Sequence, residues 1–250
     1  MKFTIVTPSY NTGKYIERTI QSVLSQSGIE LEYFVIDNES TDETIDVLSE
    51  YSDRIQVQKY RDRGQYDAIN RGWSQGTGDV FAWLNADDVY LPDALKQVAD
   101  YFTQNPEVMA VYGEAVYIDR HDQVLKPVTN IRNYSRSGLR SHDFITQPAT
   151  FLRREVVEAT GELQNYRYAF DWDYWIRVSD RFDFVRLPYV LAGYRITGDN
   201  LTTNGSDKRF KEILAVVWKY GGPYHMAHLI LRLLGKYTKR QVEIPAVEVN

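Results

Sequence analysis

The fold is decided by residues 80–88, which read Val80-Phe81-Ala82-Trp83-Leu84-Asn85-Ala86-Asp87-Asp88. The first five form a short apolar and aromatic run after Gly78, which is typical of a buried strand in a parallel sheet. The polar end of the stretch then emerges at the carboxyl end of this strand. Because open α/β sheets bind their ligands at that edge, the sequence predicts a binding site at residues 85–88.

Two adjacent carboxylates, Asp87 and Asp88, close this stretch. Side by side in a cleft they repel each other and resist burial unless a cation or hydrogen bonds compensate. A hard divalent ion such as Mg²⁺ or Mn²⁺, carrying phosphate oxygens on its far side, is the usual compensation. The alternative is that they cap the next helix, because residues 92–95 (Pro-Asp-Ala-Leu) resemble a helix start with proline at the first helical position.

Strand and helix patterns alternate through the first half of the chain. A Ser-x-x-Glu capping box at residues 40–43 is expected to open one of the helices. The order βαβαβαβ predicts an α/β fold with a doubly wound, mostly parallel sheet and helices on both faces. The patterns predict strands at 3–7, 31–36, 55–60 and 80–84 and, less regularly, at 108–112, 115–119, 149–152 and 184–187, with later helices at 154–160 and 172–181.

Composition excludes several classes of protein. The 250 residues are 43% hydrophobic and 25% charged, which is ordinary for a globular protein. No apolar run approaches the ~20 residues that span a bilayer, and the first strand pattern begins at Phe3, so we expect no signal peptide. The absence of cysteine excludes disulfides, thiolate catalysis and cysteine zinc sites, and the four histidines show no obvious zinc-ligand spacing.

The last part of the chain differs in charge from the rest. Residues 208–240 contain eight Lys and Arg and one acid, although the whole chain has a net charge of −5. We expect one domain over residues 1–207 and a basic amphipathic helical extension over 208–250. Such a helix can lie on an anionic membrane. The alternative is a helical hairpin packed on the main domain or on a second subunit. Nucleic-acid binding is disfavoured because the remaining body is acidic.

The first two strands also end in polar residues. Thr7-Pro8-Ser9-Tyr10-Asn11 follows the first, where Pro8 is expected to end the strand and Tyr10 could hold a planar ring. This departs from dinucleotide-binding folds, which place G-x-G-x-x-G here. Asp37 ends the second strand, where a carboxylate can accept a hydrogen bond from a base or ribose. The alternative is that Asp37 only shapes the turn into the next helix.

The loop at residues 62–72 leads into another helix. Gln65 and Asp67 fall in the first helical turn, near free backbone N–H groups. An acid there also suits the helix dipole, so Asp67 is equally explained by stabilisation of the helix end.

Four stretches taken together resemble the ordered motifs of family 2 glycosyltransferases of the GT-A fold. The resemblance covers roughly residues 3–200. This family transfers a sugar from a nucleotide-diphosphate sugar, usually with inversion and a divalent metal. The stretches are Thr7–Asn11, residues 35–42 (Val-Ile-Asp-Asn-Glu-Ser-Thr-Asp), Asn85–Asp88 and residues 170–177 (Phe-Asp-Trp-Asp-Tyr-Trp-Ile-Arg).

The resemblance implies a role for each matching position. Residues 1–110 would bind the nucleotide sugar and 111–207 the acceptor, with Gln147–Thr150 framing the acceptor. Asp87 and Asp88 would hold Mg²⁺ or Mn²⁺, with the direct ligand left open between them. Asp171 would be the catalytic base, whereas Asp173 is more simply structural. The nucleotide-sugar contacts implied or suggested by position are Thr7, Pro8, Tyr10, Asp37, Gln65, Asp67, Asn85, Ala86 and Asp87.

Three positions depart from the family pattern. Ile69 stands where an arginine is common, Phe170 where a glutamate often precedes the catalytic aspartate, and Thr197 where a histidine often follows a Tyr-Arg pair near the metal or phosphates. Gln65 or Asp67 could substitute for the missing arginine. Without the histidine, the metal would have fewer protein ligands, with water completing its shell.

The sequence therefore predicts an inverting, metal-dependent glycosyltransferase. We expect a UDP-sugar as donor, a hydroxyl of a glycan or lipid-linked acceptor, and a role in cell-surface polysaccharide biosynthesis on the cytoplasmic side of the membrane. One alternative is a non-catalytic nucleotide-sugar or glycan-binding module. A nucleotidyltransferase is a second alternative, disfavoured because its glycine-rich loop is missing.

Overall fold

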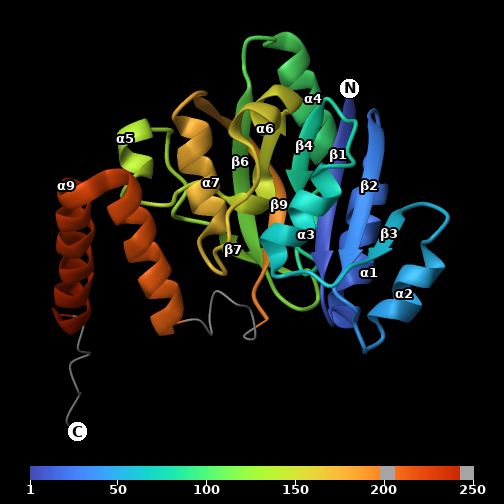
Figure 1. Cartoon of the computed structure of the whole chain (residues 1–250), viewed down its shortest axis with the longest axis horizontal. Helices are drawn as coiled ribbons and strands as arrows, with labels where there is room; N and C mark the ends of the chain where they lie inside the picture. The colour runs from blue at the N-terminus through green and yellow to red at the C-terminus, as the bar shows by residue number, and fades with distance from the viewer. Residues whose placement is uncertain (198–205, 243–250) are drawn as a thin grey trace, which may run out of the picture.

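The computed structural model describes residues 1–197 and 206–242, and within them a nine-stranded mixed sheet covered by helices. The strand order is β3-β2-β1-β4-β8-β6-β9-β5, with β7 paired to β6. Helices α1, α2 and α4 lie on one face of the sheet and α3, α6 and α7 on the other (Figure 1). The predicted α/β sheet with helices on both faces is confirmed.

The first half of the sheet is parallel and follows the predicted alternation. It contains β1 (Lys2–Ser9), β2 (Glu30–Asp37), β3 (Gln56–Lys59) and β4 (Val80–Trp83), connected by α1 (Gly13–Leu24), α2 (Thr44–Glu50) and α3 (Gln65–Trp73). The strand β1 continues past Pro8 to Ser9, two residues beyond the predicted strand at 3–7, so the prediction that Pro8 ends the strand is wrong. Because β4 ends at Trp83, opposite Val6, Pro8 pairs with a strand only on the β2 side, where it lies opposite Ile36.

The second half is mixed. The two strands predicted at 108–112 and 115–119 are one strand, β6 (Ala110–Ile118), and the strand predicted at 184–187 extends through β9 (Phe184–Arg195). β6 runs parallel to β9 and antiparallel to its other neighbours, β7 (Val124–Pro127) and β8 (Thr150–Arg153). The remaining elements are β5 (Val89–Tyr90), α4 (Ala94–Gln104), α5 (Arg136–Leu139), the 3₁₀ turn η1 (Gln147–Ala149), α6 (Arg154–Thr160) and α7 (Phe170–Ser179).

Two predicted helix starts are wrong. The capping box at Ser40 does not form, because the Ser40 hydroxyl donates to Asp37 and α2 begins only at Thr44. The helix after the acidic pair begins at Ala94, with Asp93 as the residue before it. The short strand β5 therefore separates Asp88 from α4, and the acidic pair does not cap that helix.

An aromatic core fixes α7 against β4. The rings of Trp83 and Trp175 stack with centroids 5.1 Å apart, and Trp73 packs on Trp83 at 5.5 Å and on Tyr174 at 5.7 Å. Trp83 and Trp175 are almost completely buried. This packing holds the N-terminus of α7 at the same edge of the sheet as the polar turn that follows β4, so the two ends of the candidate site have a fixed relation.

The extension forms α9 (Ser206–Val242), which breaks at Gly222 and Pro223 into two arms (Figure 1). Gly222 has φ 61°, which glycine adopts without strain. Val216, Val217 and Leu229 are buried, so part of the apolar face of α9 packs inward. In the described residues, no helix combines the length and hydropathy needed to cross a membrane.

Candidate active site

The acidic pair after β4 contains two carboxylates in different surroundings. Asp88 is buried, and its Oδ1 accepts a 2.9 Å hydrogen bond from the backbone N–H of Arg195. Asn85 donates a weaker bond, 3.3 Å long, to the other oxygen of Asp88. Burial and then the charge of Asp87 raise the pKa of Asp88 well above its ordinary range, against these hydrogen bonds. Asp87 is only half-buried.

Arg195 ties the end of β9 to this turn. Its side chain is fully buried, donates through Nε to the carbonyl of Asp87 at 2.6 Å and forms an ion pair with Asp122. The Tyr-Arg pair singled out in the sequence therefore acts through Arg195 on the backbone of the acidic turn.

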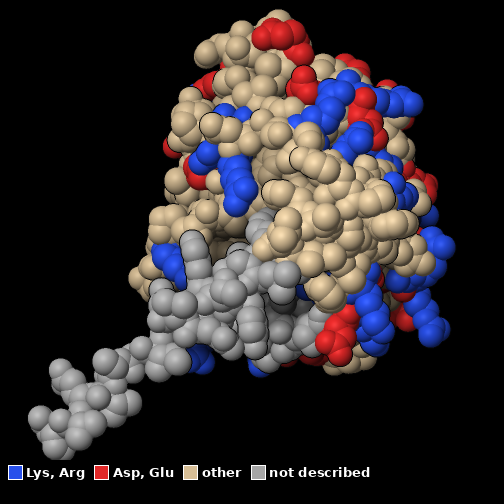
Figure 2. All heavy atoms as spheres, turned by 90° about the vertical axis from the view of Figure 1, so that its left-hand side faces the viewer, with Lys and Arg blue, Asp and Glu red and all other residues tan. Residues whose placement is uncertain are grey.

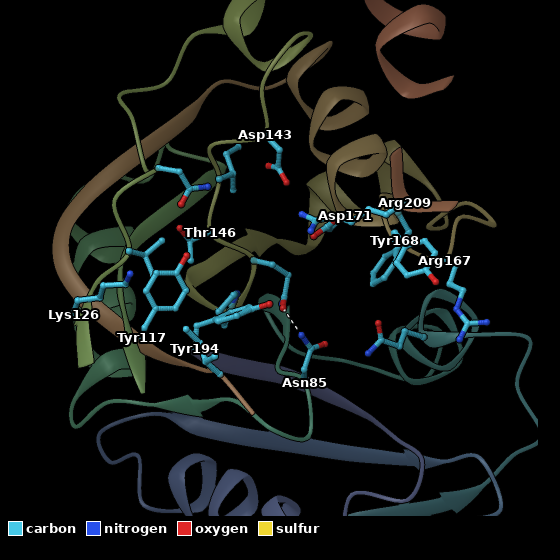
Figure 3. A pocket seen from close by; sticks show the side chains of 18 residues that line it. Asn85, Tyr117, Lys126, Asp143, Thr146, Arg167, Tyr168, Asp171, Tyr194 and Arg209 are labelled. Atoms are coloured by element: carbon cyan, nitrogen blue, oxygen red, sulfur yellow. Dashed lines mark hydrogen bonds between the residues drawn. The ribbon is translucent and has the colours of Figure 1, made fainter. Parts of the chain in front are cut away.

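A cavity of about 480 Å³ opens beside the turn (Figure 3). Asn85 reaches it from the end of β4 and donates a 3.0 Å hydrogen bond to Gln147, which in turn donates to the carbonyl of Trp83. Gln65 lines the cavity from the start of α3, and Asp171 from α7. Three predicted site residues from three elements are thus brought to one cavity.

Asp171 lies in the first turn of α7, and the backbone N–H of Trp172 donates to its Oδ1 at 2.8 Å. Burial raises the pKa of Asp171 to about 6, although the Trp172 N–H and the charge of Arg209 act to lower it. A carboxylate with such a pKa is ionised at neutral pH and is a stronger base than an exposed one, which suits proton abstraction.

The predicted nucleobase contacts lie at the ends of β1 and β2. Tyr10 is 59% exposed, whereas Thr7 is buried and its hydroxyl hydrogen-bonds that of Tyr33. Asp37 is buried, and its two oxygens accept from the backbone N–H and the hydroxyl of Ser40. This is the turn-shaping role that the sequence left open for Asp37, and contact with a base stays a prediction.

Asp67 forms an ion pair with a residue of the loop that leads into α3. Arg63 donates to both of its oxygens, through Nη2 at 2.6 Å and Nε at 3.1 Å. These bonds lower the pKa of Asp67. Arg63 is 75% exposed, so a ligand could draw it away. A direct role for Asp67 in donor binding stays a prediction.

The extension contributes to the site, which the sequence did not indicate. Glu212 of α9 accepts hydrogen bonds from the backbone N–H groups of residues 167–169, at 3.0, 2.7 and 3.2 Å. These are the residues directly before α7, so Glu212 fixes the segment that carries Asp171. Asp143, Arg167, Tyr168 and Arg209 line the cavity and were also missed as functional residues, because no motif marks their segments.

The described residues contain no group of three or more His, Asp or Glu arranged to hold a metal ion. The donor set at the acidic turn is instead a single half-buried carboxylate, Asp87, beside a buried one that already accepts two protein hydrogen bonds. This set fits the way Mg²⁺ is usually held, by one or two carboxylates with substrate phosphates and water.

Comparisons with known proteins agree with this arrangement. A family model described as glycosyl transferase family 2 matches residues 4–161. The chain belongs to this family.

Curated relatives extend the match. An uncharacterized glycosyltransferase of Nostoc sp. is 33% identical over 214 residues, which is 80% of this chain and 66% of the relative, so the chain spans slightly less than two thirds of that protein. A PGL/p-HBAD biosynthesis glycosyltransferase of Mycobacterium bovis is 29% identical, over 95% of this chain and 91% of the relative. A chondroitin synthase of Escherichia coli is 27% identical over 82% of this chain and 30% of its own length.

Solved structures share the fold. Residues 1–349 of S. aureus TarS, in complex with UDP, match with a TM-score of 0.71 and 15% identity, over 99% of this chain and 77% of that one. The mannosyltransferase PcManGT of Pyrobaculum calidifontis, in complex with GDP-Man and Mn²⁺, matches with a TM-score of 0.63 and 17% identity, over 94% of this chain and 75% of that one.

Proposed function

We propose that this chain transfers a sugar from a UDP-sugar to a hydroxyl of a glycan or lipid-linked acceptor, with inversion at the anomeric carbon. The observation that carries the proposal is the position of Asp171, a partly buried carboxylate that faces the same cavity as Asn85 of the acidic turn. One base on one side of the sugar and a leaving-group site on the other are sufficient for a single displacement.

The chemistry divides between the two ends of the cavity. Asp171 accepts the proton of the acceptor hydroxyl, and Asn85 and Asp87 face the ribose and diphosphate of the donor. A Mg²⁺ or Mn²⁺ held by Asp87 would supply positive charge to the departing diphosphate. The structural neighbours support this donor class, since TarS has been solved with UDP and UDP-GlcNAc and PcManGT with GDP-Man and Mn²⁺.

The relatives support a cell-surface product. One is named a PGL/p-HBAD biosynthesis glycosyltransferase and another a chondroitin synthase. We place the activity on the cytoplasmic side of the membrane. Five exposed large hydrophobic side chains on the described part of α9 support peripheral membrane contact: Phe210, Trp218, Tyr224, Ile230 and Leu231. Figure 2 shows on that side of the molecule an uncharged surface bordered by both Lys or Arg and Asp or Glu side chains.

Thermal stabilisation tests the donor class. The shift in melting temperature should be measured with UDP, GDP, dTDP and ADP, each with and without Mn²⁺. Ligand at ~100 times its dissociation constant adds about 2.7 kcal/mol of stability. Selective, Mn²⁺-dependent stabilisation by UDP supports the proposal. Stabilisation by GDP or dTDP instead would change the donor, and stabilisation by none of the four would favour the non-catalytic glycan-binding module.

A further inference from the structure

We propose that Asp143 and Asp171 act as one unit, a carboxylate pair that shares a single proton, with Arg209 of α9 as its counter-charge. Asp143 is then the protonated member of the pair and Asp171 the ionised one. The inference rests on the proposed function for the role of Asp171 as base, but the pair itself is a property of the protein without donor or acceptor.

The geometry brings the pair together where two cavities meet. A second cavity of about 290 Å³ lies between the segment at 141–143, α7 and α9, and it shares Asp143, Asp171 and Arg209 with the larger one. Figure 3 shows the carboxylate of Asp143 directed towards Asp171, with Arg209 approaching from the other side. The loop, α7 and α9 thus each contribute one charged group to a single point.

One carboxylate oxygen of Asp143, Oδ1, is buried without a hydrogen-bond partner in the described residues. A buried carboxylate oxygen without a partner costs stability if the group is charged, but much less if that oxygen carries a proton. The unused oxygen therefore fits a group that is held protonated beside an ionised neighbour.

The surrounding charges lead to the same result. Burial and then the charge of Asp171 raise the pKa of Asp143 well above its ordinary range, while Arg209 opposes the shift. Arg209 also acts to lower the pKa of Asp171. The other titratable or charged groups that line the two cavities are Tyr117, Lys126, His142, Arg167, Tyr168 and Tyr194.

Two facing carboxylates next to one guanidinium that acts on both are best balanced by one proton, because two neighbouring buried carboxylates cannot both ionise cheaply. At neutral pH, Asp143 holds the proton and Asp171 is ionised. During transfer the acceptor oxygen bonds to the anomeric carbon, the bond from that carbon to the diphosphate oxygen breaks, and the acceptor proton moves to Asp171. The pair then holds two protons and loses one to water before the next cycle.

Carboxyl ¹³C NMR of the full chain labelled at aspartate tests the pair without donor or acceptor. Chemical shifts are followed from pH 3 to 10 in the wild type, Asp143→Asn, Asp171→Asn and Arg209→Gln, with Asp180→Asn as a surface control on the residue that follows α7. In the wild type, Asp143 should titrate at higher pH than Asp171, with each carbon sensing both steps. Asp171→Asn should lower the midpoint of Asp143 by at least about one pH unit, since it removes a neighbouring charge.

The remaining variants separate the roles. Asp143→Asn should remove the upper step and leave that of Asp171 near 6. Arg209→Gln should raise both midpoints. Amide spectra show whether each variant folds. If a variant does not fold, the wild-type titration curves alone still test the coupling between the two carboxyl groups. The proposal is wrong if Asp143 titrates in the ordinary range of aspartate, or if its midpoint is the same in Asp171→Asn as in the wild type.

Discussion

The backbone N–H of Arg195 donates a 2.9 Å hydrogen bond to the carboxylate of Asp88, although the two residues are 107 positions apart in the chain. This bond joins the end of β9 to the turn after β4 and occupies the buried member of the acidic pair. Asp87, the half-buried member, is therefore the one we infer to meet the metal and the diphosphate. The sequence left open which of the two aspartates is the direct metal ligand, and the structure leads us to expect Asp87.

Matched amide substitutions at the two aspartates should separate their roles. Asp87→Asn should fold normally and lose the Mn²⁺-dependent part of the stabilisation by UDP, because the amide is a weaker ligand for a hard cation. Asp88→Asn keeps an oxygen for the Arg195 N–H and should retain at least part of that stabilisation. Differential scanning fluorimetry with UDP, with and without Mn²⁺, measures both. Loss of the Mn²⁺ effect only in Asp88→Asn would reverse the assignment.

The activity should follow the ionisation of Asp171. Because a base works only when deprotonated and the pKa of Asp171 is about 6, turnover should be level above about pH 7 and fall roughly tenfold per pH unit below about pH 5. Asp171→Asn should lower turnover by about 10²–10⁴-fold while the UDP-dependent thermal shift is preserved. UDP release measured across the pH range gives both results. Near-normal turnover in this variant would exclude Asp171 as the base.

The hydrogen bonds that Glu212 accepts from the segment before α7 should contribute to the free energy of unfolding. Glu212→Ala leaves three backbone N–H groups before α7 without their acceptor and should cost about 1–2 kcal/mol in urea unfolding. Glu212→Gln keeps one acceptor oxygen and should cost less. Glu107→Gln, on an exposed residue, is the control. Equal stability of Glu212→Ala and the control would mean that these bonds contribute nothing in solution.

Asp173 is expected to be structural, as its environment indicates. Its carboxylate is fully buried and accepts from Arg177 at 2.9 Å, Lys219 at 3.0 Å and Tyr220 at 2.7 Å. Asp173→Ala leaves these donors without their acceptor, so we expect a loss of about 3 kcal/mol. Chemical denaturation measures the loss. The shift in melting temperature on adding UDP should persist in the folded fraction, and a selective loss of that shift at unchanged stability would point to a functional role instead.

The parallel half of the sheet and its polar edge were predictable, because short apolar strands lead into polar residues at Ser9, Asp37 and Asn85. The second half was harder. Exposed and half-buried residues interrupt β6 and β9, so local patterns broke one strand into two and cut the other short. The division at residue 207 stays a prediction, even though Lys219 and Tyr220 bond directly to α7.

The candidate site, too, could be predicted only in part from the sequence. Asn85 and Asp171 reach one cavity, as their motif positions implied, because strand ends and helix starts are local features. Asp143 and Arg209 carry no local signal, since their chemistry arises only when a loop and a distant helix meet α7. Contacts of this kind depend on tertiary packing and cannot be found from spacing along the chain.

The attachment of α9 to α7 also bears on how the protein is made. A chain that emerges from the ribosome from its N-terminus can pair β1, β2, β3 and β4 early, since these strands are complete by Trp83. The segment around Asp171 gains Glu212, Lys219 and Tyr220 only when α9 has been synthesised. A nascent chain can therefore pair these four strands well before the segment that carries Asp171 gains its contacts, which form only once α9 has been synthesised.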